Sequence, residues 1–291
     1  MKYGKLTPYL FVLPTIVGLI VFRLGPVAVA IGASFTRWNI QTPPKFLGLN
    51  NFVELVSSET FWLIFKNTIL FTVIFVPGVM IVSLLMAVMV NQKLRGIAFF
   101  RGLYFMPYIT AMVAVAMVWN WIFATRFGVL NYVLINFFYI SDPPAWLADK
   151  TWALPALAIV AIWKQVGFQM LIFLAGLQSI PGSLYDAAAI DGANRQQQFF
   201  KITLPLLSPI TFFIFIITVI EAFKTFEVTF AMTEGGPNNA SSTLAFYIYQ
   251  NAFIFGRMGF ASALALFLLL FVGLTTLLSF KLKGRMVEYA V

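Results

Sequence analysis

Residues 178–209 read QSIPGSLYDAAAIDGANRQQQFFKITLPLLSP and form a polar island in a chain that is otherwise apolar. Ser183 and Asp186 lie near the start of a run of alanines, where a hydroxyl or an acid can cap a helix. Gly192 ends that helix, because glycine tolerates the left-handed turn found at helix C-termini. A second short amphipathic helix is expected over 195–204. The stretch therefore predicts two short helices joined at a glycine, a compact knob suited to docking on another protein, although an ordinary solvated loop explains its composition equally well.

The composition of the whole chain is that of an integral membrane protein. Of its 291 residues, 61% are hydrophobic and 10% are charged, and the mean hydropathy is +0.91, whereas a soluble domain is about a quarter charged. Cysteine and histidine are absent, which excludes disulfides, thiol catalysis and the usual transition-metal ligands. The net charge of +9 is spread over short segments between apolar runs, so nucleic acid is not an expected partner.

Six apolar stretches are long enough to cross a hydrocarbon core, which needs roughly 20 helical residues. They lie at about 8–35, 61–90, 103–123, 152–177, 206–232 and 259–280. The first follows Lys2 and Lys5 as a signal peptide would, but Arg23 interrupts its apolar run, so we interpret it as an uncleaved span. The sequence thus predicts an all-α integral membrane protein with six transmembrane helices in a single domain over 1–291.

Lysine and arginine in the connecting segments orient these spans. With the N-terminus in the cytoplasm, ten cations fall on inner segments and five on outer segments. The inner cations are Lys2, Lys5, Lys93, Arg95, Arg101, Arg195, Lys201, Lys281, Lys283 and Arg285, and the outer cations are Arg37, Lys45, Arg126, Lys150 and Arg257. The excess predicts that both termini are cytoplasmic, and it places the polar island on the cytoplasmic side.

The polar island resembles the EAA loop of permease subunits of binding-protein-dependent ATP-binding-cassette (ABC) importers. In that family Glu-Ala-Ala is followed by three residues, a glycine, nine residues and Ile-x-Leu-Pro. Here Gly192 and Ile202-Thr203-Leu204-Pro205 keep that spacing, and Asp186 stands where glutamate is usual. Further matches to the sugar-importer branch, and within it to MalF-like or UgpA-like subunits, are Asn67-Thr68 with Pro77, Phe105-Met106-Pro107, Trp163-Lys164 with Gly167, Thr233-Glu234-Gly235-Gly236-Pro237 and Met258-Gly259-Phe260.

The resemblance implies a type I ABC importer permease fold and a transport subunit for a sugar, oligosaccharide or related polyol. It implies as partners a second permease subunit (MalG-like or UgpE-like), a homodimer of ATPase subunits and an extracytoplasmic solute-binding protein, assembled in the lipid bilayer of a bacterial-type inner membrane. The sequence contains no Gly-x-x-x-x-Gly-Lys-Ser/Thr phosphate loop and no Ser-His-Asp set, so we expect no enzyme activity of its own. ATP and Mg²⁺ are expected on the partner ATPases, and no cofactor on this chain.

The resemblance also assigns the polar island, about 179–204, to a coupling loop seated in a cleft of the ATPase. Gly192 would allow the sharp turn, and Phe199 and Phe200 would brace the second short helix. The residues assigned to ATPase coupling are Asp186, Ala187, Ala188, Ala189, Asp191, Gly192, Phe199, Phe200, Leu204 and Pro205. A rigid lever of this kind passes closure of the ATPase domains into movement of the spans.

Polar and charged side chains within the predicted spans mark a candidate substrate path. Ionisable groups there cost about 2.5–3.5 kcal/mol each on insertion scales and usually face a bundle interior or a watery cavity. The candidates are Trp163, Lys164, Gln165, Gln169, Asn120, Glu221, Lys224 and Glu227. Lys224 can pair with Glu221 or Glu227 on one helical face. Two interpretations stay open, a path lined for a sugar or a buried ion pair that joins two permease subunits.

The solute and the energy source are also open. Lys164 is compatible with an anionic substrate such as a sugar phosphate and with a neutral sugar. The alternative function is a stand-alone secondary transporter, with Glu221, Lys224 and Glu227 as a proton or cation relay. Uptake by this chain alone in proteoliposomes would favour that alternative, and a neighbouring ATPase gene would favour the importer.

Two outer segments carry expectations of their own. Trp146 and its aromatic neighbours are expected to anchor the chain at the membrane interface. The family match to Glu234-Gly235-Gly236-Pro237 implies a rigid outer turn near the place where a binding protein would deliver substrate.

Overall fold

The computed structural model describes residues 7–92 and 95–286, and the chain is mostly helical. Lys2, Lys5 and Lys93, which enter the orientation argument, lie outside the described residues, as do the side chains of Lys283 and Arg285. The chain divides into two compact units. Unit 1 comprises Met1–Phe61 with Tyr247–Leu270, and unit 2 comprises Trp62–Phe246 with Phe271–Val291. The expectation of a single membrane domain stays a prediction.

Unit 1 begins with an almost continuous helical rod. The rod consists of α1 (Thr7–Leu19), a π-helical segment (Ile20–Leu24) and α2 (Gly25–Ser34). Its described apolar side chains are exposed over most of its length, as at Phe11 and Phe22, which are each 80% exposed. A helix that is apolar all round and unpacked requires lipid or another protein around it.

A hairpin and a short helix follow the rod. Strands β1 (Thr36–Arg37) and β2 (Lys45–Phe46) pair antiparallel, and the short helix α3 (Asn50–Ser57) follows. Asn51 Nδ2 donates to the carbonyl oxygens of Ser34 (2.8 Å) and Thr36 (2.9 Å). The start of α15 (Met258–Met286) approaches so closely that a Cβ on Gly259 would lie 1.9 Å from the Thr36 oxygen.

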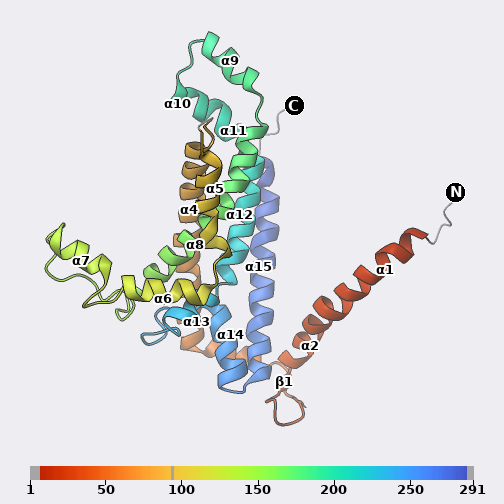
Figure 1. The fold of residues 1–291 in the computed structure, drawn as a ribbon. Helices are drawn as coiled ribbons and strands as arrows, with labels where there is room; N and C mark the ends of the chain where they lie inside the picture. Colours follow the sequence, from red (N-terminus) through yellow and green to blue (C-terminus); the bar gives the residue numbers. More distant parts are fainter. Residues whose placement is uncertain (1–6, 93–94, 287–291) are drawn as a thin grey trace. The chain divides into compact units, whose positions relative to one another are not determined.

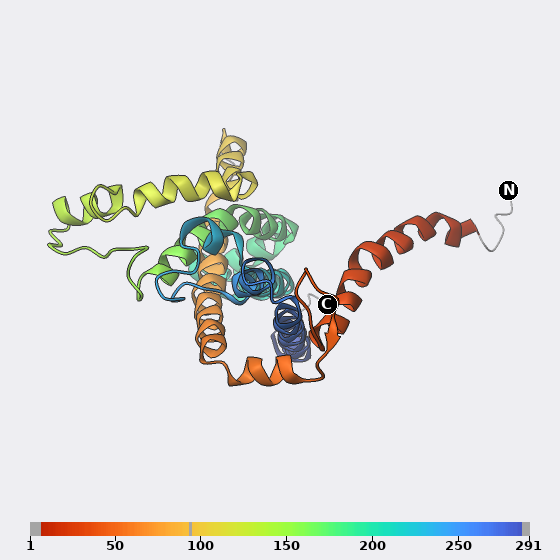
Figure 2. The same ribbon diagram turned by 90° about the horizontal axis from the view of Figure 1, so that it is seen from below.

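Unit 2 contains most of the long helices. They are α4 (Glu59–Val90), α5 (Ile97–Ile109), α6 (Met112–Ile122), α7 (Val129–Asn136), α8 (Ala153–Ser179), α12 (Ser208–Phe223), α13 (Glu227–Met232) and the later part of α15, with α14 (Leu244–Tyr249) at the boundary with unit 1. Helices α4, α5, α8 and α12 lie side by side (Figure 1). Helix α7 lies at the far end of a projection built by α6, away from the other helices of the unit (Figures 1 and 2).

Helix α8 is the centre of unit 2, because two of its glycines admit neighbouring helices. A Cβ on Gly167 would lie 2.0 Å from the backbone oxygen of Tyr104 in α5. A Cβ on Gly176 would lie 2.4 Å from Ile210 Cδ1 in α12. Side chains around α8 form two apolar cores, one with Phe71 and the other with Phe173.

Within the described residues, four helices are long and apolar enough to cross a membrane. They are Tyr9–Ser34, Glu59–Val90, Ala153–Ser179 and Met258–Leu282. Two bent pairs, α5 with α6 and the helices of 195–206 with α12, raise the number to six if each pair is one span. The chain is therefore a multi-pass membrane protein, while six crossings and cytoplasmic termini stay predictions.

The helices over the predicted spans 103–123 and 206–232 are interrupted. The first bends by 96° between Ile109 and Met112. The second stops at Phe223 and resumes only at Glu227. There the Thr225 carbonyl accepts a hydrogen bond from Thr243 Oγ1 (2.7 Å), so a residue 18 positions away takes a backbone group that a helix would use.

Trp146 is a core residue, so its expected role as an interfacial anchor is wrong. Its side chain is 9% exposed and lies 5.8 Å from the ring of Phe123. Its Nε1 donates to Asn131 Oδ1 at 2.6 Å. Trp146 thereby fastens the loop after α7 to α7 and to the end of α6, because a buried indole N–H needs an acceptor.

Candidate functional site

The polar island folds as the predicted pair of short helical segments. The first is α9 (Gly182–Ile190). The second comprises α10 (Arg195–Gln198), a π-helical segment (Phe199–Thr203) and α11 (Leu204–Leu206), which leads into α12. Figure 1 places α9 and α10 together at one end of the helices of unit 2. We call Gly182–Leu206 the coupling knob.

The turn of the coupling knob depends on two local devices. Gly192 has a φ of +80°, a conformation that favours glycine, and Ala193 N–H donates to the Ala188 carbonyl at 2.8 Å to close the end of α9. Asn194 and Gln197 then form a capping box at the start of α10, with hydrogen bonds of 2.8 and 2.9 Å.

The predicted cap at the start of α9 is wrong. Helix α9 begins at Gly182, directly after Pro181, and no side chain caps it. Pro181 holds the extended conformation that precedes a helix, with a ψ of +130°. Ser183 and Asp186 therefore lie inside the helix instead of at its boundary.

The coupling knob presents an open surface. No residue of α9 is buried, and Ile190 is 86% exposed. Tyr185 Oη lies 2.9 Å from Thr203 Oγ1, so a hydrogen bond joins the two segments. A hollow of about 410 Å³ between them is lined by Ala188, Asp191, Gly192, Ala193, Gln197, Gln198, Lys201 and Ile202.

The remaining coupling candidates differ in exposure. Phe199 is half-buried and meets Phe200 edge to face at 5.3 Å. Phe200 itself is 64% exposed. Leu204 and Pro205 are half-buried where the knob joins α12. Of the two phenylalanines, Phe199 is thus the one placed to support the second segment from inside.

Lys164 explains the bend between α5 and α6. Its Nζ donates to the carbonyl oxygens of Thr110 (2.7 Å) and Tyr108 (3.0 Å) and reaches that of Pro107 at 3.5 Å. These carbonyls lie where α5 ends. The Pro107 carbonyl also accepts from the Thr110 N–H (3.3 Å), whereas the last carbonyls of a helix otherwise have no partner within it. The ammonium supplies the missing donors and also faces the negative end of the helix dipole.

Lys164 borders a polar cavity of about 350 Å³. Five of the eight path candidates line it, although they come from helices α8, α12 and α13: Lys164, Gln165, Glu221, Lys224 and Glu227. Phe75, Met112, Ala161, Thr225, Phe226 and Val228 complete the lining. We call this the polar cavity. An adjoining hollow of about 430 Å³ shares Lys164 and Glu227 with it.

The charged trio does not form the expected pattern on one helical face. Lys224 Nζ lies 3.4 Å from Glu221 Oε1, and these side chains are 60% and 48% exposed, so the pair is not buried. Glu227 lies beyond the helix break, is exposed, and forms no ion pair with any described side chain. Glu227 lines the polar cavity, and the Lys164 ammonium attracts its carboxylate from beyond ion-pair distance.

The other three path candidates lie elsewhere. Gln169 is fully buried, and its Nε2 lies 3.5 Å from Thr218 Oγ1 in the contact between α8 and α12. Trp163 meets Trp119 edge to face at 5.7 Å and lines an apolar hollow of about 740 Å³. Asn120 is half-buried, and its Oδ1 has no hydrogen-bond partner.

The turn over 233–244, which the sequence predicts to lie on the outer side, is held by residues that the sequence matched without assigning them a role. Asn67 Nδ2 donates to the Asn239 carbonyl at 2.8 Å, and Thr68 Oγ1 accepts from the Leu244 N–H at 3.0 Å. Gly235 has a φ of +80°, and a Cβ there would lie 2.9 Å from the Phe246 ring. The turn is therefore rigid, as the family match implied.

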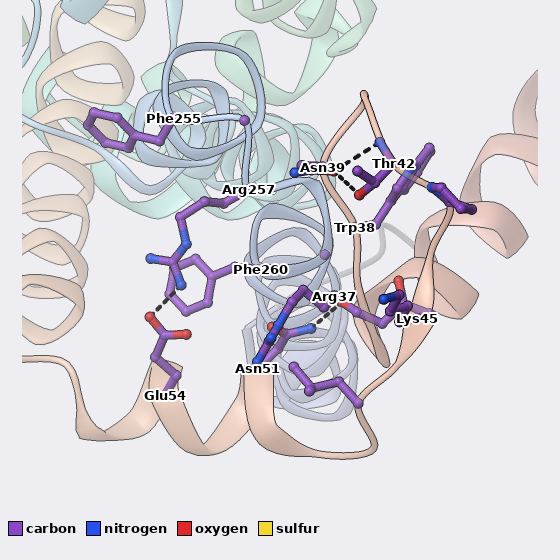
Figure 3. A pocket seen from close by; sticks show the side chains of 15 residues that line it. Arg37, Trp38, Asn39, Thr42, Lys45, Asn51, Glu54, Phe255, Arg257 and Phe260 are labelled. Atoms are coloured by element: carbon purple, nitrogen blue, oxygen red, sulfur yellow. Dashed lines mark hydrogen bonds and ion pairs between the residues drawn. The ribbon is translucent and has the colours of Figure 1, made fainter.

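Sequence reasoning missed a pocket of about 520 Å³ in unit 1 (Figure 3). Arg37 and Lys45 of the hairpin line it, together with Glu54 of α3 and Arg257. Arg257 pairs with Glu54, and its guanidinium lies 4.5 Å from the centre of the Phe260 ring. Only the separate cations were visible in the sequence, because the hairpin and the start of α15 come from opposite ends of the chain.

Comparison with known proteins shows the family. Residues 79–287 match the family described as "Binding-protein-dependent transport system inner membrane component", and the chain belongs to it. The chain is 40% identical to the probable ABC transporter permease protein YesP of Bacillus subtilis (strain 168), over 99% of this chain and 94% of YesP. It is 34% identical to the sn-glycerol-3-phosphate transport system permease protein UgpA of Agrobacterium fabrum, over 98% of this chain and 97% of UgpA.

Solved structures agree with that assignment. A chain of a bacterial ABC transporter involved in the import of the acidic polysaccharide alginate is 25% identical and superposes with a TM-score of 0.83, covering 97% of this chain and 96% of its own. The same kind of transporter in complex with an alginate pentasaccharide-bound periplasmic protein matches at 24% identity and a TM-score of 0.84, covering 98% and 96%. The protein is thus a permease subunit of a binding-protein-dependent transport system, and the ion-coupled alternative is not favoured.

Proposed function

We propose that this chain forms one half of the permease of an inner-membrane importer for a sugar, oligosaccharide or related polyol. A second permease subunit completes the pathway, two ATPase subunits bind from the cytoplasm, and an extracytoplasmic protein delivers the solute. The chain crosses the membrane six times with both termini inside, and ATP and Mg²⁺ are bound by the ATPase partners. The exposed coupling knob, with the family spacing of Gly192 and Ile202-Thr203-Leu204-Pro205, carries the proposal.

The geometry of the knob suits a lever. Its two segments are joined by the Tyr185–Thr203 hydrogen bond and by the closed turn at Gly192, so they move together. The second segment leads through Leu204–Leu206 and a bend of 63° into α12, which carries Glu221 near its other end. A displacement of α9 by closing ATPase domains is therefore passed along α12 to the polar cavity as a rigid-body movement.

The test is site-specific crosslinking, for which a chain without cysteine is a ready background. Ala188→Cys, in the hollow of the knob, should crosslink to a cysteine placed in the cleft of the ATPase, and more efficiently after ATP is added. The matched control is Ala240→Cys in the outer turn. We expect membrane-impermeant thiol reagents to label Ala240→Cys from outside and Ala188→Cys only from inside. No crosslink at Ala188→Cys, or labelling of it from outside, would overturn the proposal.

A further inference from the structure

The charges that line the polar cavity decide which ligands it can accept. Its ionisable lining residues are two lysines, Lys164 and Lys224, and two acids, Glu221 and Glu227. Formal charges therefore cancel. What matters for a ligand is which of these groups still has unused hydrogen-bonding capacity.

Both lysines already have hydrogen-bond or ion-pair partners. Lys164 Nζ already faces three carbonyl oxygens, at 2.7, 3.0 and 3.5 Å, and an ammonium has only three donors. Turning it toward a ligand would leave the end of α5 without its donors. Lys224 faces the carboxylate of Glu221 at 3.4 Å. An anion entering the cavity would have to compete for a cation that already has a partner.

Glu227 is the ionisable group whose described contacts leave hydrogen-bonding capacity unused, and the Lys164 ammonium attracts it from beyond ion-pair distance. It is exposed at the first position of α13 and forms no ion pair within the described part of the chain. A carboxylate is an acceptor only, and it forms short, strong hydrogen bonds with hydroxyl groups. Gln165 adds an amide, and Phe75 and Phe226 add apolar faces. This combination of a few polar groups on an apolar wall is typical of small-molecule sites.

We infer that the polar cavity takes an uncharged, hydroxyl-rich ligand with Glu227 as its principal acceptor, and that it discriminates against anionic ligands such as sugar phosphates and acidic sugars. The inference rests on the proposed function, since it concerns the solute that this permease would pass. It separates this chain from relatives named for glycerol phosphate and alginate. It also settles the role of Lys164, which the sequence left compatible with an anionic or a neutral substrate: Lys164 acts as a positioning residue for the bend after α5.

The experiment measures the charge of the cavity in the assembled importer, where the second permease subunit contributes its own groups. Thr225→Cys places one thiol in the cavity lining, and Ala161→Cys is a second probe position. Each thiol is reacted with a cationic and an anionic methanethiosulfonate reagent, and 2-mercaptoethanol in solution gives the reference ratio of the two rates. The Glu227 carboxylate should raise the cation-to-anion rate ratio by roughly three- to tenfold over the reference, since Lys164 offsets part of its charge.

Glu227→Gln should return that ratio to the reference, whereas the matched control Glu234→Gln, in the outer turn, should leave it unchanged. A ratio at or below the reference, or one that Glu227→Gln does not lower, would overturn the inference.

A second experiment compares ATP-driven uptake of glycerol with that of sn-glycerol 3-phosphate, and uptake of a neutral with that of an acidic oligosaccharide. Preferential uptake of the acidic members would overturn the inference and leave the importer function intact. Loss of the ATPase crosslink at Ala188→Cys would overturn the importer function, while the thiol ratio would still report the cavity.

Discussion

Two interruptions of helical structure, both in unit 2, are built in different ways. The turn between α9 and α10 uses Gly192, with its φ of +80°, and a capping box between Asn194 and Gln197. The bend between α5 and α6 has neither glycine nor proline at Thr110 and Ala111, and its nearest proline is Pro107 in the last turn of α5. It depends on Lys164, which donates to the Thr110 carbonyl from 54 residues further along the chain.

The difference matters for how each interruption responds to force. A turn held by its own residues persists when its surroundings move, as a lever requires. A bend held by a side chain from another helix changes when α5 and α8 shift relative to each other. The coupling knob is therefore suited to transmit a movement, and the bend beside the polar cavity is suited to respond to one.

Gly167→Val is the substitution with the largest expected effect, because it disrupts the contact between α8 and α5 that places Lys164 beside the bend. The new side chain would meet the backbone of Tyr104, with the Cβ 2.0 Å from its oxygen. Helices α5 and α8 would have to separate, at a cost of about 3 kcal/mol or more. We expect the assembled complex to be lost, measured as yield in size-exclusion chromatography. The control is Gly102→Val, whose Cβ would meet nothing within 4 Å; equal losses would contradict the close approach.

Lys164→Met should have the next largest effect. It keeps the length of the side chain but removes the donors to the end of α5, at a cost of about 2–3 kcal/mol. The α5–α6 bend should become variable. Distances between spin labels on Val113→Cys and Ala161→Cys would report this as a broader distribution. Lys224→Met is the matched control, and a distribution as narrow as that of the native lysine would show that Lys164 does not hold the bend.

Asn194→Ala should act only within the coupling knob. It removes the capping box and costs about 1 kcal/mol. Amide hydrogen exchange should accelerate over 195–203 and stay unchanged near Thr110. The exposed Gln196→Ala in the same helix serves as control. Spread of the effect to the α5–α6 bend would break the distinction between the two interruptions.

Glu221→Gln should have the smallest effect on stability. Its ion pair with Lys224 is about half exposed, so its loss should change the free energy of unfolding by no more than about 0.5 kcal/mol. Thermal unfolding of the purified complex would measure this. A loss of several degrees in Tm would show that the pair becomes buried against the second permease subunit, as one interpretation of the sequence held.

Several features of the fold could be predicted because their signals are local or repeat over many residues. The lengths of the apolar runs predict the four helices that can cross the membrane, and Gly192 and Asp191 mark the end of α9. The cap at Ser183 was misplaced because Pro181 already starts that helix. Of the predicted path, Lys164, Gln165, Glu221, Lys224 and Glu227 line the polar cavity, whereas Gln169 belongs to a helix contact.

The sequence by itself determined the membrane class, the family and the form of the coupling knob, since hydropathy, motif spacing and turn chemistry are properties of consecutive residues. Only the tertiary structure decided that two expected spans are broken, that Trp146 is a core residue, and that Lys164 is already hydrogen-bonded while Glu227 forms no ion pair with any described side chain. These outcomes depend on groups that lie far apart in the chain. Their hydrogen-bonding capacity is assigned only when the helices that carry them come together.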